Sequence, residues 1–383
     1  MHVAVVGGGI VGLASAYYLA ERGVPVTVLE KDALGSGSTG RANGGIRAQF
    51  TSGVSVALSR ESMAVWDRFE ERFGVDIDHR RTGYLFLART ADTAERFREN
   101  VAVQNDLGVS SEYLGPEAAG ERCPGLYTDR YVGATYGPAD GFADPHLALQ
   151  GFSRAATAAG ATIETGVAVT DVRTNGGTVV GVETTDGVRE ADYVVNAAGP
   201  WAARVGAMAG LDLPVSPRRR QLLVADPDSP VPADTPMTVD VDASVHFRPE
   251  RDGRAVVGGR FSDRDPERDP DDYRTSSDLD WAAETLEAAS EVAEYFGPAS
   301  GVVRGWAGLY AVTPDHHPII EETRPGFVSA VGFSGHGFMQ SPATGRVVAE
   351  LIVDGEARTV DVSPLAADRF ERGGTLSEGT VID

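Results

Sequence analysis

The sequence predicts an α/β fold that opens with a parallel strand–helix–strand unit and later includes an antiparallel meander. Residues 2–6 form a short apolar run bounded by glycine, as expected of a buried parallel strand. Residues 10–22 follow as a helix that Gly23 ends, and residues 26–30 form a second strand. Further short strands, with hairpin turns at 175–177 and 186–187, are expected at 162–165, 167–173, 178–184 and 192–196.

Several later segments show helical or loop patterns. Apolar residues at helical spacing predict a helix over 56–73, and Asp144-Pro145 is an N-cap followed by proline at the first helical position. Further helices are expected from about 280 to Gly297-Pro298 and from Ser341-Pro342 onward, with a strand at 327–332 between them. The charged run 263–272 predicts a solvated loop, and residues 373–383 a loose tail.

Composition narrows the possible classes of protein. The 383 residues suggest two or three domains, and 56 acidic against 34 basic residues give a net charge of −22. Such a surface disfavours nucleic acid and anionic lipid as partners. Lys31 is the only lysine, so Schiff-base chemistry on lysine is excluded almost everywhere. Acid excess with so little lysine predicts a protein that works in concentrated salt, where charge repulsion is screened.

Cysteine content and hydropathy point to a protein of the reducing cytoplasm. The single cysteine, Cys123, excludes an internal disulfide, a cysteine-rich zinc site and an iron–sulfur cluster. The apolar stretch 3–20 lacks a positively charged start, so neither a signal peptide nor a membrane span is expected. Residues 315–317 (Asp-His-His) lie between prolines and are expected to form an ordinary turn, so no metal site is predicted.

The first loop carries a dinucleotide-binding pattern. Gly7, Gly9 and Gly12 form G-x-G-x-x-G directly between the first strand and the first helix. The first glycine allows the turn, the second admits a pyrophosphate, and the third lets helix and strand pack closely. Glu30 ends the second strand, where a carboxylate binds ribose hydroxyls and disfavours a 2′-phosphate. An adenine dinucleotide other than NADP is therefore predicted.

Three further segments favour FAD over NAD. Residues 35–47 supply small residues, the hydroxyls of Ser38 and Thr39, and then Gly44-Gly45, which would let the backbone approach a flat ring. Residues 192–201 place a buried strand before an Ala-Gly turn. Residues 332–339 (GFSGHGFM) put glycine-rich backbone ahead of a helix N-terminus, which would stabilise the negative charge of a reduced flavin.

Motifs spread over nearly the whole chain resemble the flavoprotein family of D-amino-acid oxidase, glycine oxidase and sarcosine oxidase. They are the glycine fingerprint, STGRANGGIR at 38–47, DP at 144–145, NAAGPW at 196–201, GWAGLY at 305–310 and FSGHGF at 333–338. The resemblance is nearest to sarcosine oxidase, monomeric or β subunit, and to the β subunit of dye-linked proline dehydrogenase. It implies a discontinuous Rossmann-like FAD-binding domain (1–84, 141–214 and 314–368), a substrate domain with a mixed or antiparallel sheet (85–140 and 215–313), and a C-terminal tail (369–383).

The resemblance also implies roles for individual residues. Arg47 matches an arginine that binds the substrate carboxylate, Tyr310 an active-site tyrosine, and His336 a histidine bordering the flavin. Adenine would meet the backbone of Val169. The cofactor-binding residues expected in full are Gly7, Gly9, Ile10, Val11, Gly12, Glu30, Lys31, Ser38, Thr39, Arg41, Gly44, Gly45, Ile46, Val169, Ala198, Gly199, Trp201, Gly308, Gly335, His336, Gly337, Phe338 and Met339.

Departures from the family pattern carry information too. Tyr310 stands where glycine oxidase and D-amino-acid oxidase have a carboxylate-binding arginine, so free D-amino acids lose support as substrates. Met339 and about Val256 replace two lysines of monomeric sarcosine oxidase, the second of which activates oxygen. A dehydrogenase with another, unknown acceptor is therefore favoured. Gly308 and about Arg41 replace flavin-linking residues, so the FAD is expected to be noncovalent.

These observations together predict an FAD-dependent enzyme that takes a hydride from the carbon next to nitrogen of a small N-substituted or cyclic amino acid to flavin N5. Sarcosine, dimethylglycine and proline are the expected types of substrate, and Arg260 is a further candidate partner for the carboxylate. Three alternatives stay open: a 2-hydroxy-acid dehydrogenase using His336 or His317 as base, a flavin subunit of a multi-subunit amine dehydrogenase, and a non-enzymatic flavin-binding role. A hetero-oligomer is compatible with the second alternative.

Overall fold

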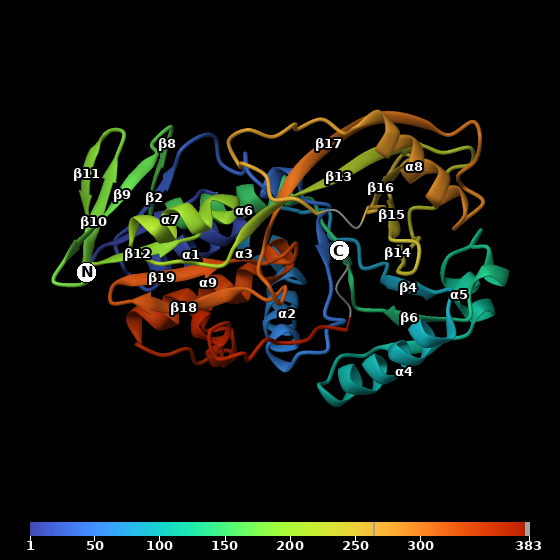
Figure 1. Cartoon of the computed structure of the whole chain (residues 1–383), viewed down its shortest axis with the longest axis horizontal. Coiled ribbons are helices and arrows are strands. Elements are labelled where there is room, and N and C mark those ends of the chain that lie inside the picture. Colours follow the sequence, from blue (N-terminus) through green and yellow to red (C-terminus); the bar gives the residue numbers. More distant parts are fainter. Residues whose placement is uncertain (263–264, 380–383) are drawn as a thin grey trace.

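The computed structural model describes residues 1–262 and 265–379. One of its two large sheets has six strands in the order β18-β19-β12-β1-β2-β8, drawn from both ends of the chain (Figure 1). All neighbouring strands run parallel except β18, which is antiparallel to β19. The predicted opening strand–helix–strand unit is confirmed. The strands are β1 (Val3–Val6), β2 (Val26–Glu30), β8 (Thr162–Thr165), β12 (Tyr193–Asn196), β18 (Ile319–Arg324) and β19 (Phe327–Val331).

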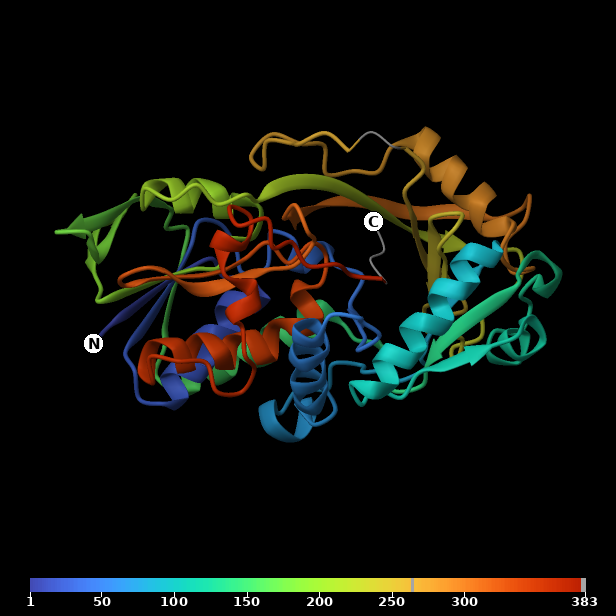
Figure 2. The same cartoon turned by 60° about the horizontal axis from the view of Figure 1, so that its bottom comes forward.

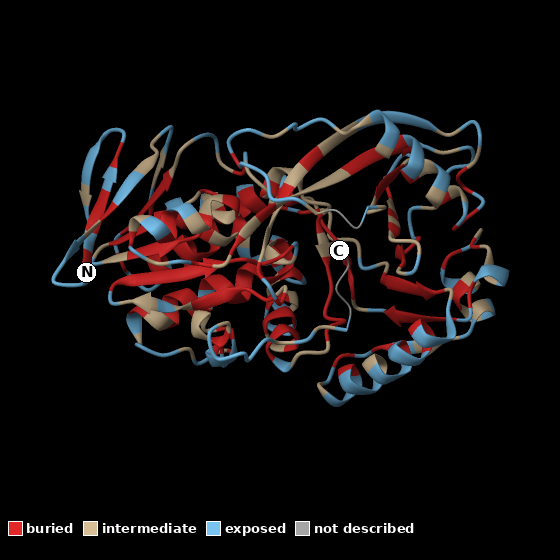
Figure 3. Ribbon diagram, in the orientation of Figure 1, coloured by how far each residue is buried: buried red, intermediate tan, exposed pale blue. Residues whose placement is uncertain are grey.

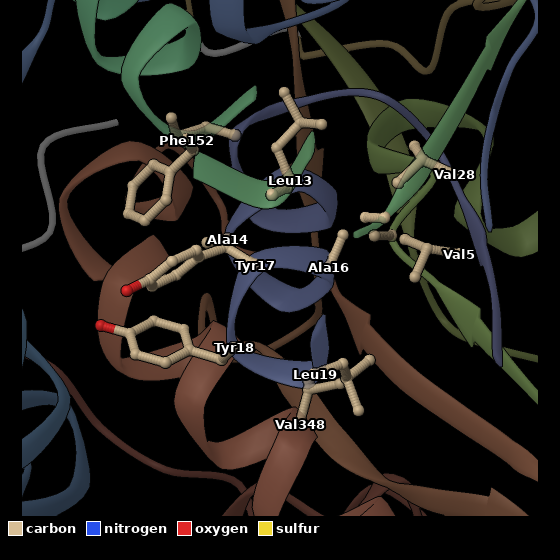
Figure 4. Packing of buried hydrophobic residues seen from close by; sticks show 14 of the residues in the cluster. Val5, Leu13, Ala14, Ala16, Tyr17, Tyr18, Leu19, Val28, Phe152 and Val348 are labelled. Atoms are coloured by element: carbon tan, nitrogen blue, oxygen red, sulfur yellow. The ribbon is translucent and has the colours of Figure 1, made fainter. Parts of the chain in front are cut away.

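Helix α1 (Ile10–Glu21) lies at the centre of the main core and packs against α6 (Pro145–Ala158) and α9 (Gly337–Val353). Leu13, Leu19 and Val28 are completely buried there, beside Phe152 and Val348 (Figure 4). Buried side chains of this size each stabilise the fold by about 1.5–3 kcal/mol relative to exposure. Figure 3 shows the consequence, since the central strands of this sheet are almost entirely buried, whereas α6 keeps an exposed face.

The second large sheet has eight strands in the order β17-β13-β16-β15-β14-β4-β6-β5 and is partly covered by α4, α5 and α8 (Figure 2). β13 and β17 form its longest ladder, from Ser216 opposite Val312 to Asp226 opposite Gly301. The elements are β4 (Tyr84–Ala88), β5 (Glu112–Leu114), β6 (Gly133–Gly137), β13 (Ser216–Asp226), β14 (Met237–Asp240), β15 (Val245–Pro249), β16 (Ala255–Gly259), β17 (Gly301–Val312), α4 (Ala91–Asp106), α5 (Pro116–Arg122) and α8 (Leu279–Ser290). We propose that the two sheets mark the two domains expected from the sequence.

The meander is smaller than predicted. The separate three-stranded sheet consists of β9 (Val169–Asn175), β10 (Thr178–Thr184) and β11 (Gly187–Glu190), with both predicted hairpin turns in place. No strand was predicted over 187–190, so β11 is an addition to the prediction. The expected strands at 162–165 and 192–196 belong to the six-stranded sheet, because they pair in parallel with β2 and β1. A two-stranded ribbon of β3 (Gly45–Ile46) and β7 (Gly141–Phe142) and helix α7 (Ala202–Met208) complete this half.

The predicted helix 56–73 is two helices, α2 (Gly53–Trp66) and α3 (Phe69–Phe73). The chain leaves helical geometry at Arg68, where φ is −119°, and the break lets the rings of Trp66 and Phe69 stack with centroids 5.3 Å apart. The helix predicted to run from 280 to Gly297 ends instead at Ser290. Irregular turns after Ser290 bury Val292 and Phe296, so apolar spacing alone overestimated its length.

Helix α9 starts four residues earlier than predicted, at Gly337, and therefore contains Pro342. Proline has no amide hydrogen to donate to the carbonyl of Phe338 four residues before it. The hydroxyl of Ser341 donates to that carbonyl at 2.9 Å instead. Ser341 is thus a substitute donor inside the helix rather than its N-cap.

The tail 373–379 is docked, contrary to the prediction that it is loose. The carboxylate of Glu378, whose side chain is 3% exposed, accepts hydrogen bonds from the amides of Thr51 and Ser52 and from the Thr51 hydroxyl. The Leu376 amide donates to the carboxylate of Asp315. Residues 380–383 of the predicted tail, and 263–264 of the predicted solvated loop, lie outside the described residues.

Candidate functional site

A cavity of about 520 Å³ lies between the two sheets, within the size range of small-molecule and cofactor sites. One side is formed by the β1–α1 turn, the end of β2, residues 35–45, the β12–α7 turn and residues 332–339. The other side is formed by residues of β13, β14, β15, β16 and β17. The cavity therefore joins the predicted dinucleotide-binding unit to the second sheet.

The three fingerprint glycines have different roles in the structure. Gly7 has a φ of +112°, and a Cβ on it would lie 2.5 Å from the carbonyl oxygen of Ala197. A Cβ on Gly12 would lie 2.0 Å from the carbonyl oxygen of Gly7, so this residue is needed for packing and does not line the cavity. Gly9 lines the cavity and has only the Thr39 hydroxyl, at 3.3 Å, near its Cβ position. These are the separate roles expected of the three glycines around a pyrophosphate: one for the turn, one for close approach of the ligand and one for helix packing.

The end of β2 fits the ribose of an adenine dinucleotide. Glu30 lines the cavity, and its carboxylate accepts hydrogen bonds from the amides of Gly8 at 2.7 Å and Asp32 at 2.9 Å. These bonds fix the carboxylate beside the N-terminus of α1, whose partial positive charge favours phosphate. The first turn of α1 carries no acidic residue, and the Ile10 amide donates to the Thr39 hydroxyl. The donor set therefore fits the predicted dinucleotide.

Gly44 and Gly45 are required because neighbouring protein atoms leave no space for a Cβ, and not only because a flavin ring would need room there. Gly44 has a φ of +81°, and its Cβ would lie 2.0 Å from the carbonyl oxygen of Ala143. A Cβ on Gly45 would lie 1.9 Å from the hydroxyl of Tyr84. All but Ala143 line the cavity, so the two glycines let Tyr84 of the second sheet reach it.

The two positions that the resemblance associates with covalent flavin attachment meet in the structure. A Cβ on Gly308 would lie 2.9 Å from the Cβ of Arg41, and both residues line the cavity. The Arg41 carbonyl accepts from the Trp306 indole at 3.0 Å. Neither glycine nor a charged guanidinium offers a nucleophile for a covalent link.

We therefore expect acid precipitation to release all of the flavin. Noncovalent FAD depends on the folded cavity, so denaturation should transfer the yellow colour completely to the supernatant. Absorbance of the supernatant and fluorescence of the washed pellet check this. Flavin that stays with the precipitated chain would show that a residue other than Gly308 or Arg41 is linked to it.

Arg47 is a buried cation at the wall of the cavity. It directly follows β3, is 1% exposed, and donates hydrogen bonds to the Gln49 carbonyl and to Nε2 of His336, the latter at 3.2 Å. The centre of the guanidinium lies 4.0 Å from the Phe50 ring centroid, a cation–π contact. Burial lowers the pKa of Arg47, but a guanidinium stays protonated in proteins.

His336, the N-cap of α9, contacts both Arg47 and Phe50. Because Arg47 donates to Nε2, the proton of the neutral ring is on Nδ1. Burial, and then the charge of Arg47, hold the pKa of His336 well below its usual range, so the ring is neutral. The predicted trio is brought together, since Arg47, His336 and Tyr310 all line one cavity.

A buried acid supports the backbone next to Arg47. Asp140 is 1% exposed, and its carboxylate accepts from the Ala48 amide at 2.9 Å and from the Gln49 side chain at 3.1 Å. Burial nevertheless raises the pKa of Asp140 from 3.8 to about 6, because desolvation outweighs the hydrogen bonds and the nearby positive charge of Arg47.

Asp140 should make stability decrease as the pH rises from about 4 to about 6. In this window the folded protein binds more protons at this group than the unfolded chain, so the free energy of unfolding falls with rising pH. The pKa shift corresponds to about 3 kcal/mol. Urea unfolding at pH 4 and pH 7 should show this loss in the wild type and not in Asp140→Asn. The exposed Asp171→Asn should keep the wild-type dependence, and an equal loss in all three proteins would contradict the assignment.

Most of the expected cofactor residues line the cavity, but Gly12 and Ile46 do not. Ile46 is completely buried in the main core, where β3 pairs with β7. Arg260, proposed from the sequence, does line the cavity. The sequence missed cavity residues contributed mainly by the second sheet and by α7, namely Tyr84, Arg204, Met208, Arg220, Gln221, Leu222, Met237, Val239, Ser244, His246 and Asp271.

His246 was not recognisable in advance because no local pattern marks it. It lies on β15 opposite Gly258, and a Cβ on that glycine would be 2.6 Å from the imidazole. Burial, and to a lesser degree Arg248, lower the pKa of His246 to about 4, so the ring is neutral at the cavity wall.

The Asp-His-His turn has structural partners. The carboxylate of Asp315 pairs with Arg369 at 2.8 Å. Nδ1 of His317 lies 2.7 Å from the Asp315 carbonyl, and Nε2 lies 3.1 Å from the Ser52 hydroxyl. Within residues 1–262 and 265–379 no group of three or more His, Cys, Asp or Glu side chains is arranged as a metal site. In the same part of the chain, no helix combines the length and the apolar character that crossing a bilayer requires.

Comparison with known families and proteins agrees with this site. Residues 2–351 match the model of a family described as FAD dependent oxidoreductase. The chain is 32% identical to glycine oxidase from Geobacillus kaustophilus, covering 96% of each chain, and 30% identical to sarcosine oxidase subunit beta from Arthrobacter, covering 98% of this chain and 92% of that protein. It is 28% identical to human mitochondrial dimethylglycine dehydrogenase, but spans only 42% of that protein.

A solved structure extends the likeness to three dimensions. The crystal structure of L-proline dehydrogenase from P. horikoshii superposes with a TM-score of 0.89 at 34% identity, covering 98% of this chain and 99% of that one. The match includes both sheets, so it covers the second wall of the cavity as well as the dinucleotide-binding unit.

Proposed function

Since this chain belongs to the FAD dependent oxidoreductase family, we propose that it oxidises a small N-substituted or cyclic α-amino acid at the carbon next to nitrogen. Sarcosine, dimethylglycine and proline are the types of substrate considered. The coarser statement, an FAD-dependent oxidoreductase acting on amino acids, follows from the family and its members. The names of the relatives given above support the narrower class.

The buried guanidinium of Arg47 is the observation that carries the proposal. It lies at the cavity wall, contacts the neutral ring of His336, and shares the cavity with Tyr84 and Tyr310. A planar guanidinium in a dry site recognises a carboxylate with two parallel hydrogen bonds. An amino acid held in this way would present its amine and adjacent carbon to the rest of the cavity.

Bound FAD supplies the hydride acceptor, and the chain's own residues hold the two molecules in place. The β1–α1 turn and Glu30 would bind the dinucleotide, while residues 41–45 and the N-terminus of α9 would hold the flavin end. Arg47 orients the substrate carboxylate, and apolar side chains such as Met237 and Val239 exclude water from the same cavity. Hydride loss from a neutral amine demands no side-chain base.

The protonation states favour an amine over a 2-hydroxy acid. Oxidation of a hydroxy acid needs a base for the hydroxyl proton. His336 accepts a hydrogen bond from Arg47 and its pKa lies well below the usual range, so it is a weak base. His317 does not line the cavity, and the pKa of His246, which does, is lowered to about 4.

We also propose that the acceptor is not oxygen. The only lysine, Lys31, is bound to Asp271 at 2.5 Å, and β16 carries Val256 where an oxygen-activating lysine is expected from the resemblance. An enzyme of this kind would pass electrons to a dye, a quinone or a protein. The likeness to a sarcosine oxidase subunit beta supports a second candidate, a flavin subunit within a hetero-oligomer.

The acid excess, the single lysine and the buried Cys123 support a protein of the reducing cytoplasm that works in concentrated salt. Burial raises the pKa of the Cys123 thiol to about 12, which makes it unreactive.

Anaerobic bleaching of the visible flavin band by a panel of compounds tests the proposal. Sarcosine, dimethylglycine or proline should bleach the purified chain, whereas glycolate and lactate should not. Turnover with a dye acceptor and slow reoxidation by air would support a dehydrogenase acting as a single chain. Bleaching without turnover on the dye would favour the subunit of a larger complex. Bleaching by hydroxy acids alone, or by nothing, would reject the amine proposal.

A further inference from the structure

A charged segment of the second domain reaches the dinucleotide end of the cavity. We call residues 267–272, between β16 and α8, the strap. Its first residues are fastened to β13, because the Arg268 amide donates to the Pro217 carbonyl at 2.9 Å and Glu267 lies 3.2 Å from the Ser216 hydroxyl. Beyond the strap, the Ala307 amide of β17 donates to the Thr275 carbonyl at 2.7 Å. Both ends are therefore held by the eight-stranded sheet.

The tip of the strap binds residues of the other half of the molecule. The Asp271 carboxylate accepts hydrogen bonds from Lys31 Nζ at 2.5 Å, Trp201 Nε1 at 2.8 Å and Arg204 at 2.6 Å. Asp269 also pairs with Arg204, at 2.6 Å. The ammonium of Lys31 additionally lies 4.0 Å from the Trp201 ring centroid. Figure 1 shows the loop, in gold, extending from the ends of β13 and β17 toward α7.

These contacts are made at the rim of the cavity. Lys31, Trp201, Arg204 and Asp271 all line it, and Lys31 directly follows Glu30 at the expected ribose site. Trp201 and Arg204 come from the β12–α7 segment, and β12 and β2 are the two strands that flank β1 in the sheet. The tip of the strap thus connects Lys31, which follows β2, with Trp201 and Arg204 of the β12–α7 segment at the dinucleotide end of the cavity.

We propose that the strap is a latch that retains FAD, with Asp271 as the positioning residue that holds Lys31, Trp201 and Arg204 over the dinucleotide. For FAD to leave, the Asp271 contacts have to open. This inference rests on FAD binding and not on the identity of the amino-acid substrate.

The charge of Asp271 distinguishes a latch from a carboxylate that only lies near the dinucleotide. Lys31 lowers the pKa of Asp271, so the carboxylate is ionised at neutral pH. A carboxylate near a pyrophosphate repels it, so a merely adjacent Asp271 would weaken FAD binding, and its neutralisation would slow FAD release. A latch has the opposite sign, because neutralisation frees the two cations from the strap and accelerates release. The side chains of these pairs are 33–49% exposed, so added salt should weaken the pairs.

The test measures FAD release from the holoprotein by the fluorescence of the freed flavin after dilution. Asp271→Asn keeps the shape of the side chain and removes its charge, and it should accelerate release about threefold to tenfold. Asp272→Asn is the matched control, because it removes the same charge from the next residue, whose side chain makes no described contact. It should leave the release rate within about 1.5-fold of wild type.

Salt supplies the second measurement. Between 0.1 M and 2 M NaCl, roughly the range in which screening becomes complete, release from the wild type should accelerate relative to Asp271→Asn, so that their ratio approaches one. Equal rates for Asp271→Asn and Asp272→Asn, or slower release from Asp271→Asn, would overturn the proposal. A chain that never binds FAD would instead reject the assigned cofactor, and a chain that binds FAD but is bleached by no amino acid would leave the latch intact while rejecting the proposed substrate.

Discussion

Replacing Arg47 by alanine should lower kcat/KM for the preferred amino acid about 100- to 1,000-fold, which corresponds to about 3–4 kcal/mol. The guanidinium is buried, so its hydrogen bonds to a substrate carboxylate are made without competition from water. Removal also deprives the incoming carboxylate of the buried counter-charge that Arg47 provides. Most of the loss should appear in KM, because carboxylate binding is the same before and during hydride loss.

Two matched variants separate this role from a structural one. Arg47→Lys keeps a charge without the planar fork, so it should recover only part of the activity. Arg248→Gln removes a largely buried arginine, 13% exposed, which pairs with Glu250 and does not line the cavity. It should lower the melting temperature with little change in KM. The FAD spectrum of each purified variant shows whether the cavity is intact, and an unchanged KM in folded Arg47→Ala would refute the carboxylate role.

Local sequence patterns predicted the parts of the molecule that depend on short-range rules. The β1–α1–β2 unit follows from an apolar run, three glycines and Glu30 within thirty residues, and the structure confirms it. The cavity-lining residues within 35–47 and 332–339 were predicted for the same reason, because glycine spacing and the position of a helix N-terminus can be recognised in a short stretch of sequence. Arg47, Tyr310 and His336 came from the family resemblance, and the structure brings them to one cavity.

The second wall of the site could not be found in this way. Tyr84, Met237 and His246 look like ordinary residues of alternating strands, and only the order of strands in the eight-stranded sheet turns them toward the cavity. The docked tail was missed because Glu378 finds its partners, Thr51 and Ser52, more than 300 residues earlier in the chain.

The strap shows the same limit most clearly. Residues 263–272 contain nothing apolar except two prolines, so the sequence predicts a solvated loop. Residues 266–269, 271 and 272 are exposed as predicted, whereas Pro270 is buried. Two of these acids nevertheless meet Lys31 and Arg204 with good geometry. Complementary charge at distant positions, not composition, decides where this segment lies.

Gly12→Ala should prevent the chain from folding, whereas Gly9→Ala should give a folded protein that binds FAD at least tenfold more weakly. The two glycines belong to one motif but are needed for different reasons. A Cβ on Gly12 would lie 2.0 Å from the backbone oxygen of Gly7, so β1 and α1 could not pack. This contact cannot be relieved by a side-chain rotation, so the cost is expected at or above the upper end of the ~1–3 kcal/mol that is typical of overpacking.

Gly9 has a φ of −83°, which any residue adopts, and its Cβ would meet only the Thr39 hydroxyl at 3.3 Å. The added methyl group would therefore disturb the chain little but occupy the cavity beside the N-terminus of α1, where the pyrophosphate is expected. Circular dichroism should report a wild-type fold for Gly9→Ala, and titration with FAD should report the lost affinity. Gly53→Ala, with open space around its Cβ and a place in the first turn of α2, is the neutral control. If Gly9→Ala bound FAD normally, the dinucleotide would have to lie away from the α1 N-terminus, and the binding role given to Glu30 and Thr39 would fail with it.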